Sequence, residues 1–172
     1  MQENLAERLT EIMKKYHVAP AQINLEITET AAAHSDMLEN NIKILHKQGI
    51  EFSLDDYGSG YSNTDYLFRF PFRIVKIDKN ILWEAFKNEK AMIALRNTIR
   101  MIKELGLEIV VEGVENQEYV DYLTEQHCDY LQGYFYSKPI PDRDFLELLR
   151  RENAQYYAER FSKNELSDII TT

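Results

Sequence analysis

The most informative part of the sequence is Phe52-Ser53-Leu54-Asp55-Asp56-Tyr57-Gly58-Ser59-Gly60-Tyr61-Ser62, an apolar run that ends in two aspartates and a loop of glycine and serine. Neighbouring side chains of a β-strand point to opposite faces, so both carboxylates can reach one ligand only where the strand stops and the backbone turns. Gly58 and Gly60 permit that turn because glycine tolerates positive φ. Adjacent carboxylates repel each other unless a cation lies between them. The stretch therefore predicts either a polar turn or part of a metal site.

The composition is typical of one soluble domain. A chain of 172 residues can bury a core of its own. The net charge of −9 argues against binding to nucleic-acid polymers, which requires a basic surface. Cys128 is the single cysteine, so no internal disulfide can form and we expect a reducing, cytoplasmic location. No run approaches the roughly 18 apolar residues of a membrane span, so we expect no membrane contact by this segment.

Apolar spacing predicts five strands that alternate with helices. The expected strands are residues 23–28, 51–55, 73–78, 108–111 and 130–135. The expected helices are residues 4–16, 35–47, 64–69, 80–105 with a break near Asn88, 116–126 and 143–157. This alternation requires parallel pairing through right-handed crossovers, which leaves a doubly wound sheet or a β/α barrel. A complete barrel needs eight units and about 250 residues, so five units cannot close one without a second chain.

Polar side chains stand at the carboxyl ends of all five expected strands. In chain order they are Glu26 and Glu29, Asp55 and Asp56, Lys76 and Asp78, Glu112 and Glu115, and Gln132. In a parallel β/α arrangement these ends share one face, where ligands bind. Carboxylate and amide oxygens are hard ligands, which favours Mg²⁺, Mn²⁺ or Ca²⁺, and the histidines lack the spacing of a zinc site. Several carboxylates with a lysine suit metal-assisted phosphodiester hydrolysis.

Five motifs, taken in order, resemble those of EAL-domain cyclic-di-GMP phosphodiesterases. They are Leu25-Glu26-Ile27-Thr28-Glu29, Asp55-Asp56-Tyr57-Gly58-Ser59-Gly60-Tyr61-Ser62, Lys76-Ile77-Asp78, Glu112-Gly113-Val114-Glu115, and Gln132-Gly133-Tyr134 with Ser137-Lys138-Pro139. The resemblance implies the C-terminal portion of such a domain, an incomplete (β/α) TIM-type barrel of about five parallel units. We expect the truncated EAL domain in residues 1–150 and a C-terminal helical extension and tail in residues 151–172.

The resemblance also implies a role for each matching residue. It implies two Mg²⁺ or Mn²⁺ ions with ligands from Glu26, Asp55 and Asp56. The implied catalytic residues are Lys76, which orders a nucleophilic water or contacts phosphate, and Glu112. The implied substrate and loop residues are Glu29, which anchors the loop after the aspartates, Asp78, Glu115, Gln132, Gly58 and Tyr61. The family reaction opens cyclic di-GMP to linear pGpG in bacterial second-messenger signalling.

Two departures from the family pattern limit what these 172 residues are expected to do alone. The namesake Glu-Ala-Leu motif and the later motif whose asparagine completes the first metal shell are absent from the sequence. We therefore expect this chain alone to be inactive, and the alternative is a degenerate module that binds cyclic di-GMP or another protein. Open sheet edges predict a homodimer, and an upstream sensory or GGDEF domain is the expected companion in the full-length protein.

Plainer interpretations of single residues also remain. Glu29, Glu112 and Glu115 could be acids that stabilise the start of a helix, and Lys76 could be a solvated surface lysine. Trp83 is most simply a helix-packing residue.

Overall fold

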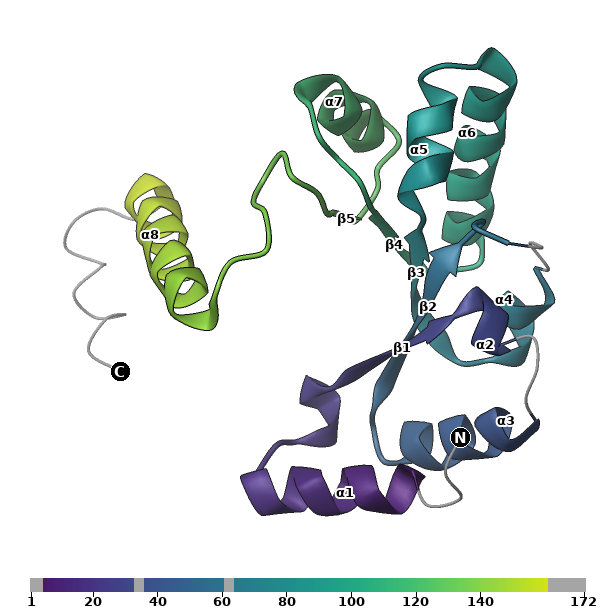
Figure 1. Ribbon diagram of the computed structural model, residues 1–172, viewed down its shortest axis with the longest axis vertical. Helices are drawn as coiled ribbons and strands as arrows, with labels where there is room; N and C mark the ends of the chain where they lie inside the picture. The colour runs from purple at the N-terminus through teal and green to yellow at the C-terminus, as the bar shows by residue number, and fades with distance from the viewer. Residues whose placement is uncertain (1–4, 33–35, 61–63, 161–172) are drawn as a thin grey trace. The chain divides into compact units, whose positions relative to one another are not determined.

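The computed structural model describes residues 5–32, 36–60 and 64–160 (Figure 1). The chain forms two compact units that divide between Tyr136 and Ser137. The second unit contains the helix α8 (Asp142–Arg160), and the expected boundary at residue 150 lies inside that helix. The first unit holds the sheet and every residue discussed below.

The sheet contains five parallel strands, and their order follows the sequence. They are β1 (Asn24–Thr28), β2 (Glu51–Tyr57), β3 (Phe72–Ile77), β4 (Glu108–Val111) and β5 (Tyr130–Leu131). A doubly wound sheet reverses its strand order at a switch point, whereas sequential order is that of a β/α barrel. The order β1-β2-β3-β4-β5 therefore resolves the ambiguity left by the sequence. Among the described residues β1 and β5 each pair with one strand, so the sheet is an open arc of a barrel.

The helices of the first unit lie largely where the apolar spacing predicts them. They are α1 (Leu5–Tyr16), α3 (Asp36–Lys47), α4 (Asp65–Arg69), α5 (Lys79–Ala85), α6 (Glu89–Glu104) and α7 (Gln117–Glu125), together with a short 3-10 turn, η1 (Pro20–Gln22). The break near Asn88 is confirmed, since the Asn88 side chain accepts a hydrogen bond from Lys90 N and caps α6. The four-residue helix α2 (Glu29–Ala32) was not predicted. None of the described helices is long and apolar enough to cross a membrane.

The last strand is shorter than predicted. The prediction of a strand over residues 130–135 is wrong beyond Leu131, where pairing with β4 stops at Val111. After that point the backbone turns, because Phe135 N donates to Val114 O and Tyr136 N donates to Gly133 O. The neighbouring strand β4 itself ends at Val111, so the later residues have no strand to pair with.

The hydrophobic core lies between the sheet and its helices. Strand residues that point toward the helices are fully buried, as Val75 and Ile77 on β3 show, while Lys76 between them points to the opposite face. Helix residues complete the core, and those with no exposure include Leu82, Leu95, Ile102 and Leu123. Burial of each such side chain stabilises the folded state by about 2 kcal/mol relative to leaving it exposed. This packing holds the strands in place and leaves the opposite face free for polar side chains.

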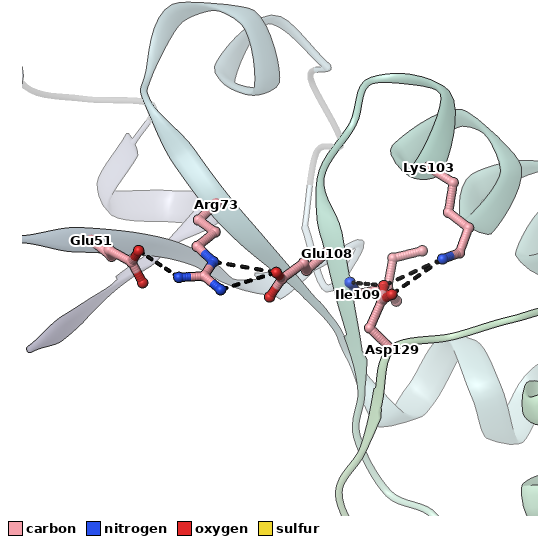
Figure 2. A network of polar contacts seen from close by, with 6 residues as sticks. All are labelled: Glu51, Arg73, Lys103, Glu108, Ile109 and Asp129. Atoms are coloured by element: carbon pink, nitrogen blue, oxygen red, sulfur yellow. Dashed lines mark hydrogen bonds and ion pairs between the residues drawn. The ribbon is translucent and has the colours of Figure 1, made fainter. Parts of the chain in front are cut away.

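The amino ends of the strands are tied together by ion pairs. Arg73 on β3 donates to Glu51 at the start of β2 and to Glu108 at the start of β4 (Figure 2). Next to them, Asp129 accepts a hydrogen bond from Ile109 N at 2.8 Å and pairs with Lys103 Nζ at 3.3 Å. These contacts link β2, β3, β4, α6 and the residue before β5 at one end of the sheet, away from the carboxyl ends.

Candidate metal and phosphate site

The two adjacent aspartates occupy a β-bulge in β2. Leu54 pairs with Val75 and Tyr57 pairs with Ile77, so Asp55 and Asp56 together lie opposite the single residue Lys76. Asp56 adopts a left-handed conformation with φ of 57°, which an aspartate tolerates better than most residues. An inserted residue shifts the alternation of the strand by one position, and bulges often re-aim side chains next to active sites. Two consecutive carboxylates can therefore face the same ligand without the strand ending.

This bulge corrects the sequence-based prediction of a strand end. The strand was expected to stop at Asp55 and to turn at the glycines, but β2 continues to Tyr57. The glycine at position 58 does have a positive φ of 88° and follows the strand directly. The two carboxylates are re-aimed by the left-handed residue Asp56, two positions before the first glycine of the predicted turn.

Lys76 lies at the centre of the acidic cluster. Its ammonium is 2.8 Å from Asp55, 2.9 Å from Glu26 and 3.0 Å from Glu112. These three carboxylates come from β1, β2 and the residue after β4, and Lys76 itself lies on β3. The site therefore spans four adjacent strands. The side chain of Lys76 is 10% exposed, which rules out the alternative of a solvated surface lysine. The plainer alternative for Glu112 is also not what the structure shows, because Asn116 caps the following helix.

The cluster keeps Lys76 charged. Burial by itself lowers the pKa of an ammonium, but hydrogen bonds to Asp55, Glu26 and Glu112 outweigh burial and hold the pKa of Lys76 well above its usual range. The side chain therefore stays a cation at physiological pH. The three carboxylates engage the three donors of this ammonium, and a donor becomes available to a phosphate oxygen or a water molecule when one of the carboxylates turns to a metal ion instead.

The carboxylates suit a divalent cation. One carboxylate oxygen from each of Asp55, Asp56 and Glu112 lies within 4.8 Å of the other two, and all three side chains are half-buried. Oxygen-only donors at this spacing fit a hard divalent cation better than zinc, and no histidine or cysteine joins the group among the described residues. Glu26, which is half exposed, reaches the group through Lys76. The four carboxylates carry more negative charge than one ammonium can neutralise, so the cluster favours added cations.

Glu29 contacts the loop that follows the bulge. It is the first residue of α2, it is 4% exposed, and its Oε2 accepts a hydrogen bond from Gly58 N at 3.0 Å. Burial raises the pKa of the neighbouring Tyr57, and the charge of Glu29 raises it further. Glu29 thus combines the two alternatives considered from the sequence, since it starts a helix and also holds the loop.

The remaining predicted residues lie around this centre in different ways. Gln132 is exposed and its Nε2 donates to Glu112 at 3.3 Å, whereas Glu115 is exposed and outside the acidic group. Asp78 is buried and serves as the N-cap of α5, accepting hydrogen bonds from the backbone and side chain of Asn80. Tyr61 lies outside the described residues.

Trp83 makes a contact near the site that the sequence did not predict. Its indole nitrogen donates to the carbonyl oxygen of Gly113 at 2.8 Å, next to Glu112. A tryptophan on a predicted helix suggests packing, and no pattern in the sequence pointed to a backbone partner 30 residues away.

Comparison with known proteins agrees with this geometry. A family profile described as the EAL domain matches residues 1–139. The chain belongs to the EAL domain family. The EAL chain is 33% identical over 145 residues to the cyclic di-GMP phosphodiesterase RocR of Pseudomonas aeruginosa, a match that covers 83% of this chain and 37% of RocR. The EAL chain therefore spans little more than a third of that relative.

Solved structures show the same fold. The EAL domain of Mycobacterium smegmatis DcpA superposes with a TM-score of 0.80 at 29% identity, over 88% of this EAL chain and 68% of that one. Klebsiella pneumoniae BlrP1, in a complex with manganese and cyclic di-GMP, superposes with a TM-score of 0.71 at 27% identity, over 77% of this chain and 34% of that one. These likenesses confirm the prediction of an incomplete α/β barrel of the EAL type.

Proposed function

We propose that this chain supplies the metal-binding and phosphate-binding part of an EAL-type phosphodiesterase that hydrolyses cyclic di-GMP to linear pGpG. The observation that carries the proposal is the convergence of Asp55, Asp56 and Glu112 within 4.8 Å of one another, with Lys76 beside them. Relatives named as cyclic di-GMP phosphodiesterases support the substrate, since the cluster by itself indicates only a metal and a phosphate.

Each residue of the candidate site then has a specific role. Asp55, Asp56 and Glu112 would hold Mg²⁺ or Mn²⁺, with Glu26 as a further ligand at the edge of the group. Bound ions of this kind activate a water molecule and screen the phosphate charge. Lys76 presents a fixed positive charge to a phosphate oxygen or to the attacking water, and neutralises charge that develops on the phosphodiester. Glu29 holds the loop at Gly58, so that the bulge keeps its shape.

We propose further that the 172 residues assayed alone do not hydrolyse cyclic di-GMP at a useful rate. The sequence contains no Glu-Ala-Leu motif, and incomplete ligation of a metal site costs orders of magnitude in activity. The test incubates the purified polypeptide with cyclic di-GMP and either Mn²⁺ or Mg²⁺, and follows pGpG by chromatography. Slow or absent product together with measurable binding of cyclic di-GMP is the expected result.

The outcomes of this assay separate the candidate functions. Rapid pGpG formation would contradict the proposed inactivity of the polypeptide alone. Binding of the dinucleotide without any metal requirement would favour the non-catalytic module instead. A polypeptide that binds neither Mn²⁺ nor cyclic di-GMP would refute the proposed function altogether.

We also propose that two copies of the polypeptide associate, and that a sensory or GGDEF domain accompanies this region in the full-length protein. The strands β1 and β5 each have a single partner among the described residues, and Tyr134 and Phe135 near β5 are exposed. Open strand edges and exposed aromatic side chains favour association. Light scattering should give the mass of a dimer at high concentration, and a monomer mass throughout would contradict the association.

A further inference from the structure

Two loops that carry the acidic cluster lie close against the helix α5. Gly58 follows the aspartates, and a Cβ added to it would lie 2.1 Å from Ile81 Cδ1. Gly113 follows Glu112 and has a φ of 73°, and a Cβ there would lie 2.3 Å from Lys79 Cβ and 3.1 Å from Trp83 Nε1. Real Cβ atoms essentially never come within 3.0 Å of other atoms, so a larger residue at Gly113 would collide with the Cβ of Lys79, and one at Gly58 would force the end of the Ile81 side chain to move. The first two turns of α5 are therefore in contact with both loops.

Trp83 fixes the second of these loops. Its indole N–H donates to Gly113 O at 2.8 Å, and Lys79 Nζ lies 5.5 Å from the centre of its ring. On either side of Gly113 the backbone is bonded to the sheet, since Glu112 N donates to Ile77 O and Val114 N donates to Gln132 O. The indole bond thus holds the carbonyl group of Gly113, which lies between two residues whose N–H groups are themselves hydrogen-bonded, Glu112 and Val114.

Glu112 is the member of the cluster that reaches the aspartates from the other side of Lys76. Its carboxylate is 3.0 Å from the ammonium and belongs to the group that spans 4.8 Å. The carbonyl that Trp83 holds belongs to the peptide between Gly113 and Val114, and a rotation there, passed back through Gly113, would move the Glu112 carboxylate relative to Asp55 and Asp56. Metal affinity depends on such positions, which neighbouring hydrogen bonds maintain.

We propose that Trp83 is a positioning residue, which sets the place of the Glu112 carboxylate and thereby the affinity of the cluster for a divalent cation. The inference rests on the proposed function, because it presupposes that the cluster binds a metal. It assigns a task in the site to a residue that lies on a helix and has no contact with the metal itself.

The same residue provides its own probe, since Trp83 is the only tryptophan in the sequence. Indole emission depends on the hydrogen bond and the charges around the ring, so binding of a cation at the cluster should change it. Mg²⁺ is the suitable titrant because it is diamagnetic and does not quench emission as Mn²⁺ does. The wild-type emission should change with the same midpoint that calorimetry gives for Mg²⁺ binding.

The variant Trp83→Phe removes the N–H donor and keeps an aromatic ring. Loss of one positioning hydrogen bond should weaken Mg²⁺ binding, measured by calorimetry, by about fivefold to tenfold. Tyr122→Phe is the matched control, because its hydroxyl is buried and has no hydrogen-bond partner in the part of the chain that the structure describes. This control should bind Mg²⁺ as the wild type does, and circular dichroism should show both variants folded.

The outcomes distinguish the proposed function from the proposed role of Trp83. A wild-type chain that binds neither Mg²⁺ nor Mn²⁺ refutes the proposed metal-dependent function, and the role of Trp83 with it. A wild-type chain that binds Mg²⁺ with no change in indole emission overturns the role of Trp83 alone, even where Trp83→Phe does not fold. Equal Mg²⁺ affinities of the wild type and a folded Trp83→Phe variant overturn it as well.

Discussion

The two ends of the sheet use charged residues in opposite ways. At the amino end Arg73 lies between Glu51 and Glu108, and Lys103 pairs with Asp129 (Figure 2). At the carboxyl end Lys76 faces Glu26, Asp55 and Glu112, with Asp56 beside them. Both ends join neighbouring strands through a cation on β3. The carboxyl end, however, has a larger excess of negative charge.

We interpret this difference as that between a structural network and the proposed binding site. The amino-end ion pairs are partly exposed, with side-chain exposures of 49% for Arg73, 36% for Glu51 and 32% for Glu108, and ion pairs open to solvent contribute little to stability. At the carboxyl end Asp55, Asp56 and Glu112 are half-buried while Glu26 is exposed, and the mutual repulsion of the half-buried carboxylates costs free energy in the absence of a further cation. A protein that keeps such a cluster is expected to bind a cation there. The predictions below test this contrast between the two ends.

The largest expected effect is on the rate at which Cys128, near the amino ends of the strands, reacts with a thiol reagent. Burial raises the pKa of Cys128 to about 12, while Lys103 lowers it and Asp129 raises it slightly. At pH 8 such a thiol is roughly one part in ten thousand thiolate, against about one part in four for an ordinary cysteine. Because only the thiolate reacts, Ellman's reagent should modify the folded chain more than about a hundredfold slower than the urea-unfolded chain. The folded rate should rise as the pH approaches 12, and equal rates at pH 8 would contradict the packing of this end.

The second effect concerns the two cations on β3. Lys76→Met leaves three carboxylates facing one another, and the free energy of unfolding in EDTA should fall by about 1–2 kcal/mol. Millimolar Mg²⁺ should restore part of this loss, because the ion replaces the ammonium. Thermal or urea unfolding with and without Mg²⁺ provides the measurement.

Arg73→Met is the matched variant at the amino end. Its loss of stability should be smaller, should disappear at high salt, and should not respond specifically to Mg²⁺. An equal Mg²⁺ response of both variants would show that the two ends do not differ in the way proposed.

The smallest effect compares one glycine at each end. Gly58 and Gly106 both have positive φ, of 88° and 75°, but an added Cβ would meet Ile81 at Gly58 and open space at Gly106. Gly106→Ala should cost about 1 kcal/mol of unfolding free energy through backbone strain, and Gly58→Ala about 1 kcal/mol more. Urea denaturation measures both. Equal losses would mean that the loop at Gly58 does not lie against α5 as described.

Much of the site could be predicted because parallel strands bring their carboxyl ends to one edge. Glu26, Asp55, Lys76 and Glu112 lie far apart in the sequence, yet each stands where a predicted strand ends. Apolar alternation locates strands well, and the parallel arrangement then places these four side chains together. The same reasoning left a doubly wound sheet or a barrel as alternatives, and the incomplete barrel was predicted from the resemblance to EAL domains.

Other features depend on pairing partners that a single sequence does not show. The bulge at Asp55 and Asp56 exists only relative to the register of β3, so alternation within β2 could not predict it. The short β5 depends in the same way on where β4 ends. Trp83 was interpreted as a packing residue because its partner is a backbone carbonyl, which carries no sequence signature.

The most direct test of the central claim is the binding of Mn²⁺, followed by electron paramagnetic resonance, to the wild type and to one carboxylate variant at each end of the sheet. Asp55→Asn should weaken Mn²⁺ binding on the order of a hundredfold, because it removes a charged oxygen ligand. Glu108→Gln, which removes a carboxylate charge at the amino end, should leave the affinity unchanged. Equal affinities of the wild type and Asp55→Asn, or an equal loss in both variants, would contradict a metal site at the carboxyl ends of the strands.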